Sequence, residues 1–228
     1  MKPDPDFNAY HQLLAENYED FNYGKSLSAF FMRKSHQLIE APFTSKNYFE
    51  RILEIGAGSG QHLRYVRHQF REYVMTDQST AMLEQAKSNY PSSLRERITI
   101  CSSDAYKLRF DSESFDRLIA THVLEHLYYP HQVLREWDRV VRSGGVLSIV
   151  LPCDPGLLWR LGRMLGPRSQ AHQKGISYDY WMAREHVNPF NNLKVFIEYY
   201  FERVETLWYP SRIPSMDTNL FYICNVHK

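Results

Sequence analysis

The sequence has little of several features that would assign a protein to a class at once. Its three cysteines, Cys101, Cys153 and Cys224, form no CxxC pair, and this odd, scattered number predicts reduced thiols. No run of about 18 apolar residues could span a membrane. The N-terminal residues are acidic where a signal peptide is basic and then apolar. We therefore expect a cytoplasmic protein without a transmembrane segment.

The chain also lacks an excess of either positive or negative residues. The 27 Lys and Arg residues balance 26 Asp and Glu residues, which leaves a net charge of +1 and gives no electrostatic reason to expect nucleic-acid binding. Hydrophobic residues make up 43% of the chain and aromatic residues 14%, so general disorder is excluded. The 228 residues are enough for one large domain or two small ones.

Short apolar segments alternate with amphipathic ones through the middle of the chain, which is typical of βαβ units and a parallel sheet covered by helices. Towards the C-terminus, two further strands could add an antiparallel edge. The predicted strands are residues 51–55, 73–77, 98–102, 115–121, 146–151, 203–208 and 220–225, and the predicted helices are 9–18, 26–39, 61–70, 79–90, 131–141, 155–165 and 192–201, with Gly144 and Gly145 ending the helix at 131–141.

Three glycines, Gly56, Gly58 and Gly60, follow the first of the central strands. Glycines at such a turn let a ligand lie directly on the backbone. The spacing is GxGxG, whereas a dinucleotide-binding turn has its third glycine one position later, where Gln61 stands. Glu54, at the end of the strand, would repel a diphosphate. The segment therefore favours a cationic ligand over a dinucleotide.

Acidic residues also follow the next two strands. Asp77 ends the second strand and Asp104 comes after the third, so with Glu54 they are predicted to lie at the sheet edge where ligands bind in open α/β folds. A carboxylate at Asp77 could accept both hydroxyls of a ribose, and Asp104 could accept from an adenine amino group.

In these motifs the chain resembles the class I S-adenosylmethionine-dependent methyltransferases. The matching segments, in order, are LEIGAGSG, YVMTDQSTAML, SSDAYKLRF, SFDRLIATHVLEHL and VLSIVLP, within about residues 50–152. The resemblance implies an α/β, doubly wound, seven-stranded and mostly parallel sheet with an antiparallel last strand, and S-adenosylmethionine as cofactor. It implies one domain, with an N-terminal helical cap at 1–48, a cofactor-binding core at 49–152, a substrate lid at 153–190 and a C-terminal helix and strands at 191–228.

The resemblance also implies roles for single residues. The methionine end of the cofactor would lie on Glu54 and the backbone of the glycine turn, the ribose on Asp77, the adenine near Asp104, and the methyl-bearing sulfur near Thr121 and His122. The full set of implied cofactor-binding residues is Glu54, Gly56, Ala57, Gly58, Gly60, Asp77, Gln78, Met82, Asp104, Ala105, Thr121 and His122.

Histidines and carboxylates after the fourth and fifth strands are candidates for positioning the molecule that accepts the methyl group, or for removing its proton. In a helix, His122 and His126 would share one face at i and i+4. The string HVLEH formally matches the HxxEH pattern of inverted zinc peptidases, but it follows a strand. Some quinone-pathway O-methyltransferases resemble this region and have an ExxEH metal site, whose first Glu is replaced here by His122, so no metal is predicted. The candidate catalytic residues are His126, His122, Asp154 and His186.

The resemblance thus implies an enzyme that methylates an O or N atom of a small-molecule acceptor, with a sugar or a secondary metabolite as the expected substrate. Nucleic acid is not an expected partner, because the net charge is near zero and few residues remain to bind a macromolecule. The segment ATHVLEH, in place of an Asn/Asp-Pro-Pro-aromatic motif, disfavours methylation of an exocyclic base amine but leaves RNA ribose and ring-nitrogen targets open. An NAD-type oxidoreductase and a non-catalytic nucleotide-binding module on a similar sheet are the alternatives. No motif indicates an oligomeric state.

Overall fold

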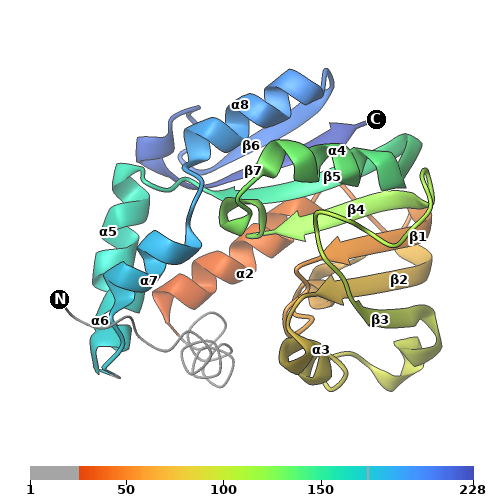
Figure 1. The fold of residues 1–228 in the computed structure, drawn as a ribbon, viewed down its shortest axis with the longest axis horizontal. Coiled ribbons are helices and arrows are strands. Elements are labelled where there is room, and N and C mark those ends of the chain that lie inside the picture. Colours follow the sequence, from red (N-terminus) through yellow and green to blue (C-terminus); the bar gives the residue numbers. More distant parts are fainter. Residues whose placement is uncertain (1–25, 174) are drawn as a thin grey trace.

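A seven-stranded sheet forms the centre of the protein in the computed structural model, which describes residues 26–173 and 175–228 (Figure 1). The order is β3-β2-β1-β4-β5-β7-β6. All pairs from β3 to β5 are parallel, and β7 runs antiparallel to both of its neighbours. The predicted doubly wound α/β sheet is therefore confirmed. The strands are β1 (Tyr48–Ile55), β2 (Gln69–Asp77), β3 (Ile98–Ser102), β4 (Phe115–Thr121), β5 (Val141–Pro152), β6 (Val204–Pro210) and β7 (Asn219–His227).

Helices cover both faces of this sheet. One face carries α4 and α8, whose Trp137 and Phe190 are buried in one apolar cluster with Leu118 of the sheet. The other face carries α2, whose Ile39 packs against Val150 and strand β7. The helices are α2 (Leu27–Glu40), α3 (Thr80–Ala86), α4 (Pro130–Val140), α5 (Leu157–Leu165), α6 (Pro167–Gln173), α7 (Tyr178–Glu185) and α8 (Phe190–Tyr200), with short 3-10 turns η1 (His62–Tyr65), η2 (Ser92–Arg97), η3 (Leu124–His126) and η4 (Met216–Thr218).

Local signals account for several helix ends. The Ser26 side chain accepts from the Ala29 amide at the start of α2, and Ser79 accepts from the Met82 amide at the start of α3, as N-cap residues do. Pro130 opens α4, whose apolar positions are buried. The prediction for residues 26–39 is thus confirmed within a residue, and the helix expected at 9–18 lies outside the described residues.

The predicted helix at 61–70 is wrong. Only η1 forms there, and strand β2 already begins at Gln69. The segment carries His62 and His68, which are both buried. His62 is hydrogen-bonded to Glu40, and His68 is hydrogen-bonded to Arg117. These inward contacts override the helical pattern, because intrinsic helix propensity is weak compared with tertiary packing. The helix expected at 79–90 likewise ends early, at Ala86.

The glycine pair Gly144–Gly145 does not end a helix as predicted. Helix α4 already ends at Val140, and β5 begins at Val141 and runs through both glycines. A Cβ atom on Gly145 would lie 2.8 Å from the Asp116 carbonyl oxygen, so a glycine lets β5 approach β4 closely here.

Helices α5, α6 and α7 gather beyond the carboxyl ends of the parallel strands, on the left in Figure 1. The sequence predicts α5 but neither α6 nor α7, and the resemblance assigns residues 153–190 to a substrate lid. In the described part of the chain, no helix combines the length and the apolar character that crossing a membrane requires.

Candidate active site

A glycine turn joins β1 to η1 at the point where the strand order reverses, between β1 and β4. Gly56 and Gly60 have φ angles of +64° and +75°, a region that L residues rarely adopt. A Cβ on Gly56 would also collide with the Val123 side chain. The Ala57 amide donates to the Thr76 carbonyl oxygen at 2.9 Å. The turn is therefore pinned to β2 and presents bare backbone at the sheet edge.

This turn borders a small hollow of about 20 Å³, which is room for about one water molecule. Five of the residues predicted to bind the cofactor line it, and so do five that the sequence did not indicate. Gln61 and His62 directly follow the glycine motif, which could have suggested them, whereas α2 is remote in sequence and gave no signal. The lining residues are Glu54, Gly56, Ala57, Thr121 and His122 from the prediction, with Met32, His36, Ser59, Gln61 and His62 in addition.

Glu54 is the acidic side chain in the hollow, and it is only 2% exposed. The Tyr73 hydroxyl donates to its Oε2 at 2.8 Å. Burial, assisted by the charges of Glu40 and Asp77 and opposed by His62 and Tyr73, raises the pKa of Glu54 to about 7. A cation placed in the hollow would restore the ionised form, because an opposite charge favours ionisation.

Asp77 lies one strand further along the same edge. Its Oδ2 accepts from the Gly58 amide at 2.9 Å, and its Oδ1 accepts from the Ser79 amide at 2.8 Å. Each oxygen keeps a further lone pair for a ligand. The carboxylate thus fixes the glycine turn relative to α3, although Asp77 does not line the hollow.

The remaining predicted cofactor residues are spread along this edge. Asp104 is exposed, and its Oδ1 accepts from the Tyr106 amide at 2.9 Å. Gln78 is exposed, whereas Met82 and Ala105 are buried. Like Asp77, these residues and Gly58 and Gly60 lie outside the small hollow.

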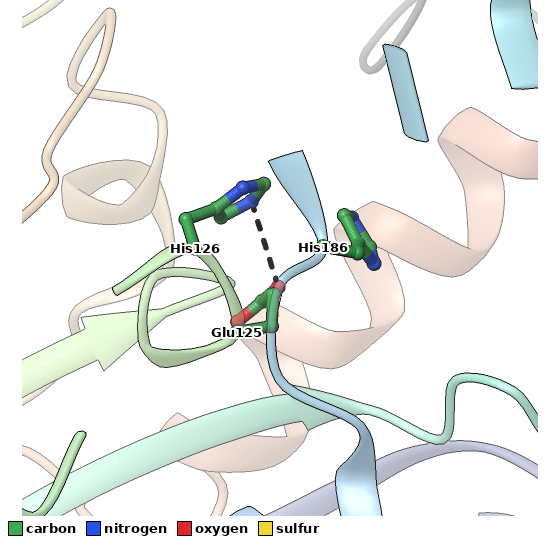
Figure 2. A group of neighbouring side chains, drawn as sticks. All are labelled: Glu125, His126 and His186. Atoms are coloured by element: carbon green, nitrogen blue, oxygen red, sulfur yellow. Dashed lines mark ion pairs between the residues drawn. The ribbon is translucent and has the colours of Figure 1, made fainter. Parts of the chain in front are cut away.

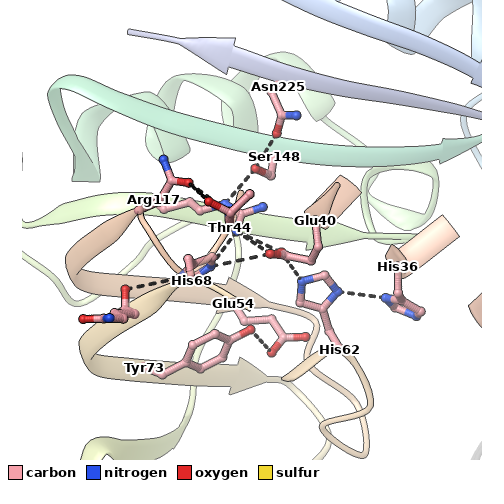
Figure 3. A network of polar contacts seen from close by, with 12 residues as sticks. His36, Glu40, Thr44, Glu54, His62, His68, Tyr73, Arg117, Ser148 and Asn225 are labelled. Atoms are coloured by element: carbon pink, nitrogen blue, oxygen red, sulfur yellow. Dashed lines mark hydrogen bonds and ion pairs between the residues drawn. The ribbon is translucent and has the colours of Figure 1, made fainter. Parts of the chain in front are cut away.

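A buried polar network extends from the hollow through the face covered by α2 (Figure 3). His36 Nδ1 lies 2.9 Å from His62 Nδ1, and His62 Nε2 lies 2.9 Å from Glu40 Oε1. Glu40 in turn pairs with Arg117, whose Nη1 donates to Glu40 Oε2 at 3.0 Å and lies 2.8 Å from Oε1. Burial opposes ionisation of Glu40, but Arg117 and His62 outweigh it and lower the pKa of Glu40 to about 2.

Arg117 connects this network to the sheet. It is fully buried, donates from Nε to Ser148 Oγ at 2.9 Å, and has its guanidinium carbon 3.9 Å from the centre of the Phe43 ring. Ser148 Oγ then donates to Asn225 on β7 at 2.7 Å. The sequence gave no sign of this network, because its members come from five separate elements.

The structure separates His122 and His126, so their expected common helix face is wrong. His122 has a φ of +58°, and only the short turn η3 follows it. His122 Nε2 lies 3.0 Å from Ser35 Oγ on α2. His126 instead points to the C-terminal end of α7, where its Nδ1 lies 2.9 Å from the Glu185 carbonyl oxygen.

The other two predicted catalytic residues, Asp154 and His186, contact each other. His186 Nδ1 lies 2.8 Å from Asp154 Oδ2, and Arg163 Nη1 lies 3.3 Å from the same oxygen. Burial opposes ionisation of Asp154, yet His186 and Arg163 outweigh it and lower the pKa of Asp154. The two side chains border a cavity of about 320 Å³, whose lining is Asp154, Pro155, Arg163, Asp179, Met182, Ala183, His186, Asn188 and Pro189.

His126 and His186 also lie close together, with ring centres 4.9 Å apart, and Glu125 lies beside them (Figure 2). Glu125 Oε1 is 3.9 Å from His122 Nδ1 as well. Glu125 is 2% exposed, and burial together with the charge of Asp154 raises its pKa to about 8. Of the four predicted catalytic residues, His122 thus lines the hollow, and Asp154 and His186 border the cavity, whereas His126 lines neither of them.

Comparisons with known proteins identify the type of domain that carries this site. Residues 53–149 match the family model of a methyltransferase domain. A chloroplastic 2-methyl-6-phytyl-1,4-hydroquinone methyltransferase of Oryza sativa subsp. japonica is 27% identical over 161 residues, which cover 70% of this chain and 44% of that protein.

Solved structures show the same fold. A putative S-adenosylmethionine-dependent methyltransferase of Methanococcus maripaludis superposes with a TM-score of 0.64 at 15% identity, covering 100% of this chain and 97% of that one. The [4+2]-cyclase SpnF superposes with a TM-score of 0.65 at 16% identity, covering 99% and 98%.

Residues 53–149 therefore match a methyltransferase domain, as the resemblance implied, and the whole chain has the fold of these solved proteins. The chain spans less than half the length of the two rice hydroquinone methyltransferases that it matches.

Proposed function

We propose that this protein transfers the methyl group of S-adenosylmethionine to a small-molecule acceptor. The observation that carries the proposal is the glycine turn with a buried carboxylate, Glu54, beneath it and a second carboxylate, Asp77, bound to its Gly58 amide. These groups fit the cofactor chemically, since Glu54 suits its ammonium group and Asp77 its ribose hydroxyls.

The cofactor needs more room than the hollow of about 20 Å³ provides. Met32, His36 and His62 border this hollow from the side of α2 and η1, so their side chains have to move aside when the cofactor binds. Sequence comparison supports the same cofactor, because the matched domain spans both the glycine turn and Asp77.

Bound S-adenosylmethionine supplies an electrophilic methyl group on a positively charged sulfur. Held by Glu54 and Asp77, the cofactor would supply this methyl group to the acceptor atom and leave with a neutral sulfur, and a protonated acceptor atom would give its proton to a side chain of the protein. The chain has to align the acceptor in line at about 3–3.5 Å, exclude water and receive that proton.

The acceptor would enter the cavity beside Asp154 and His186. Its volume of about 320 Å³ is at the small end of ligand pockets, which favours a small molecule over a macromolecule. His126, His122, Asp154 and His186 would position the acceptor and hold its proton, and an O or N atom of a sugar or secondary metabolite is the proposed target. A hydroquinone is named as the substrate of the rice relatives, so a phenolic acceptor belongs in the same screen.

Equilibrium binding of labelled S-adenosylmethionine to the purified protein tests the proposal. We expect saturable binding of one molecule, displacement by S-adenosylhomocysteine and no displacement by NAD. No binding at up to about 1 mM cofactor by folded protein would overturn the proposal, and tight NAD binding would favour an oxidoreductase. Because one protein of this fold is named a cyclase, methyl transfer itself has to be followed by mass spectrometry of the acceptors.

Cofactor binding should also depend on pH through Glu54. Its pKa of about 7 means that a proton has to leave before the carboxylate can pair with the ammonium group. That ammonium group stays protonated below about pH 7.7. We expect affinity for S-adenosylhomocysteine to rise roughly tenfold between about pH 5.5 and pH 7, measured by isothermal titration calorimetry.

The variant Glu54→Gln provides the control, because it keeps the shape and removes the titrating group. It should bind more weakly at pH 7 and lose most of the pH dependence. The sign for the free protein is opposite: a carboxyl with a raised folded pKa makes folding less favourable as pH rises from about 4.5 to 7. If the affinity for S-adenosylhomocysteine rose equally with pH in the wild type and in Glu54→Gln, the result would contradict the assignment of Glu54.

A further inference from the structure

We propose that Glu125, His126 and His186 bind one divalent transition-metal ion beside the cavity that Asp154 and His186 border. Each side chain offers one ligand atom, and these atoms all lie within 4.8 Å of one another. Figure 2 shows the three side chains around one space between η3 and the segment after α7. The first two come from one short turn, while the third is 60 residues later in the chain.

The hydrogen bond of His126 prepares its ring to bind a metal. Nδ1 lies 2.9 Å from the Glu185 carbonyl oxygen, and a carbonyl oxygen can only accept, so Nδ1 carries the proton. In the neutral ring, Nε2 then keeps its lone pair, and this atom lies 3.9 Å from Glu125 Oε1. Histidines that ligate metals typically donate their other N–H to a carbonyl or carboxylate group in this way.

His186 has the same arrangement with a different partner. Its Nδ1 lies 2.8 Å from Asp154 Oδ2, so its Nε2 is likewise the ring atom left for a ligand. Asp154 also accepts from Arg163, which holds the carboxylate in place. A carboxylate behind a histidine orients the ring and makes it a better ligand. Asp154 is therefore a positioning residue for this site.

Glu125 is an independent indication that a cation belongs here. The residue is 2% exposed, and its Oε2 has no hydrogen-bond partner in the described part of the chain. Its other oxygen lies 3.9 Å from His122 Nδ1 and 3.9 Å from His126 Nε2, which is too long for a hydrogen bond. A buried polar group without a partner is costly, and a metal ion would provide the missing one.

Backbone contacts hold the two halves of the site together. The Asn188 amide donates to the Glu125 carbonyl oxygen at 3.1 Å, and the Asn188 side chain donates to the Leu127 carbonyl oxygen at 2.5 Å. The Phe190 amide donates to the Asp154 carbonyl oxygen at 2.8 Å. The segment that carries His186 is thus fixed against both η3 and the end of β5, so the ligands are close before an ion arrives.

The ligand types indicate which ion fits. Two imidazoles with one carboxylate suit Zn²⁺ and its first-row neighbours, whereas Mg²⁺ and Ca²⁺ prefer oxygen ligands. With bonds of about 2.0–2.1 Å, ligands on a tetrahedral zinc ion are about 3.3 Å apart. The side chains therefore have to close by an ångström or so, within the reach of rotamer adjustments at Glu125 and His126.

Three protein ligands leave a coordination position for another molecule. His186 and Asp154 also border the cavity of about 320 Å³, so this position would face the acceptor. Such an ion lowers the pKa of a bound hydroxyl group. This use of the metal rests on the proposed methyl transfer and assigns the acceptor to the hydroxyl compounds, whereas the binding of the metal does not depend on it.

Titration of Zn²⁺ into the chelator-treated full chain, without any cofactor, tests the site. We expect one equivalent to bind with a dissociation constant of micromolar or below, in competition with a chromogenic chelator, and millimolar Mg²⁺ not to displace it. The variants His186→Ala and His126→Ala should each weaken binding by at least about 100-fold, and Asp154→Asn by about 10- to 100-fold. The matched control His131→Ala, on α4, should bind like the wild type.

Absence of stoichiometric Zn²⁺ binding, or equal affinity in the wild type and in folded His126→Ala and His186→Ala variants, would overturn the proposal. Circular dichroism establishes which variants fold, and His126 is 36% exposed in its side chain, which makes its replacement mild. Binding of S-adenosylhomocysteine is measured on the same samples. A wild type that binds this ligand but not Zn²⁺ refutes the metal site alone, while the reverse result refutes the proposed function alone.

Discussion

Replacing Arg117 with methionine should destabilise the protein by about 3–5 kcal/mol, the cost of breaking a buried ion pair from one side. Arg117 is fully buried and donates to Glu40, which is 2% exposed. Without the guanidinium group, Glu40 would remain a buried carboxylate bound mainly to His62. The free energy of unfolding in urea, at neutral pH, measures the effect.

Two variants separate the ion pair from ordinary packing. The double variant Glu40→Met with Arg117→Met should be more stable than Arg117→Met alone, because both charges are gone. Arg71→Met removes a surface pair with Glu50, in which Arg71 is 76% exposed, and should cost less than about 1 kcal/mol. An equal loss of unfolding free energy in Arg117→Met and Arg71→Met would show that breaking the buried ion pair costs no more than breaking a surface pair.

The same pair gives the protein a sensitivity to acid. The pKa of Glu40 is lowered from 4.5 to about 2, so the folded state binds this proton less readily than the unfolded chain does. The stabilisation is fully present above about pH 4.5 and is lost as pH falls towards 2. The wild type should therefore lose more stability than the double variant over this range.

Replacing Asp77 with alanine should weaken S-adenosylhomocysteine binding by about 100-fold, or about 2.7 kcal/mol. Two effects add in this variant. The proposed contact to the ribose hydroxyls is lost, and the amides of Gly58 and Ser79 lose the acceptor that fixes the glycine turn. Hydrogen bonds to charged groups are worth about 1.5–3 kcal/mol each. Isothermal titration calorimetry measures the affinity.

The variant Asp77→Asn keeps one carbonyl oxygen as an acceptor and should lose less affinity, about tenfold. Glu84→Ala, on the adjacent helix α3, removes an exposed carboxylate paired with Lys87 and should leave affinity unchanged. An Asp77→Ala protein that is folded and binds as tightly as the wild type would contradict the position of the ribose.

The order of elements could be predicted because each one carries its own signal. The strands at 98–102 and 115–121 match β3 and β4 residue for residue, since apolar runs bounded by turn residues need no knowledge of the rest of the chain. The helix at 61–70 failed for the opposite reason. Its histidines satisfy Glu40 and Arg117, which lie on other elements, and no local pattern encodes such partners.

The class of fold and the position of the glycine turn could be inferred from the sequence alone. Gly56, Glu54 and Asp77 lie within one segment of two successive parallel strands, so their spacing alone puts them at the same edge of the sheet. Short-range geometry is enough there, because neighbouring parallel strands end together.

The residues that surround this turn are known only from the structure, because they come from segments that are distant in the sequence. Helix α2 brings His36 and Met32 to the hollow, and the segment after α7 brings His186 beside His126 and Asp154. These contacts join residues tens of positions apart, and they follow from how the helices pack on the sheet and on one another. The residues that would face the acceptor are therefore set by packing across the whole domain, where no single segment of the sequence carries the information.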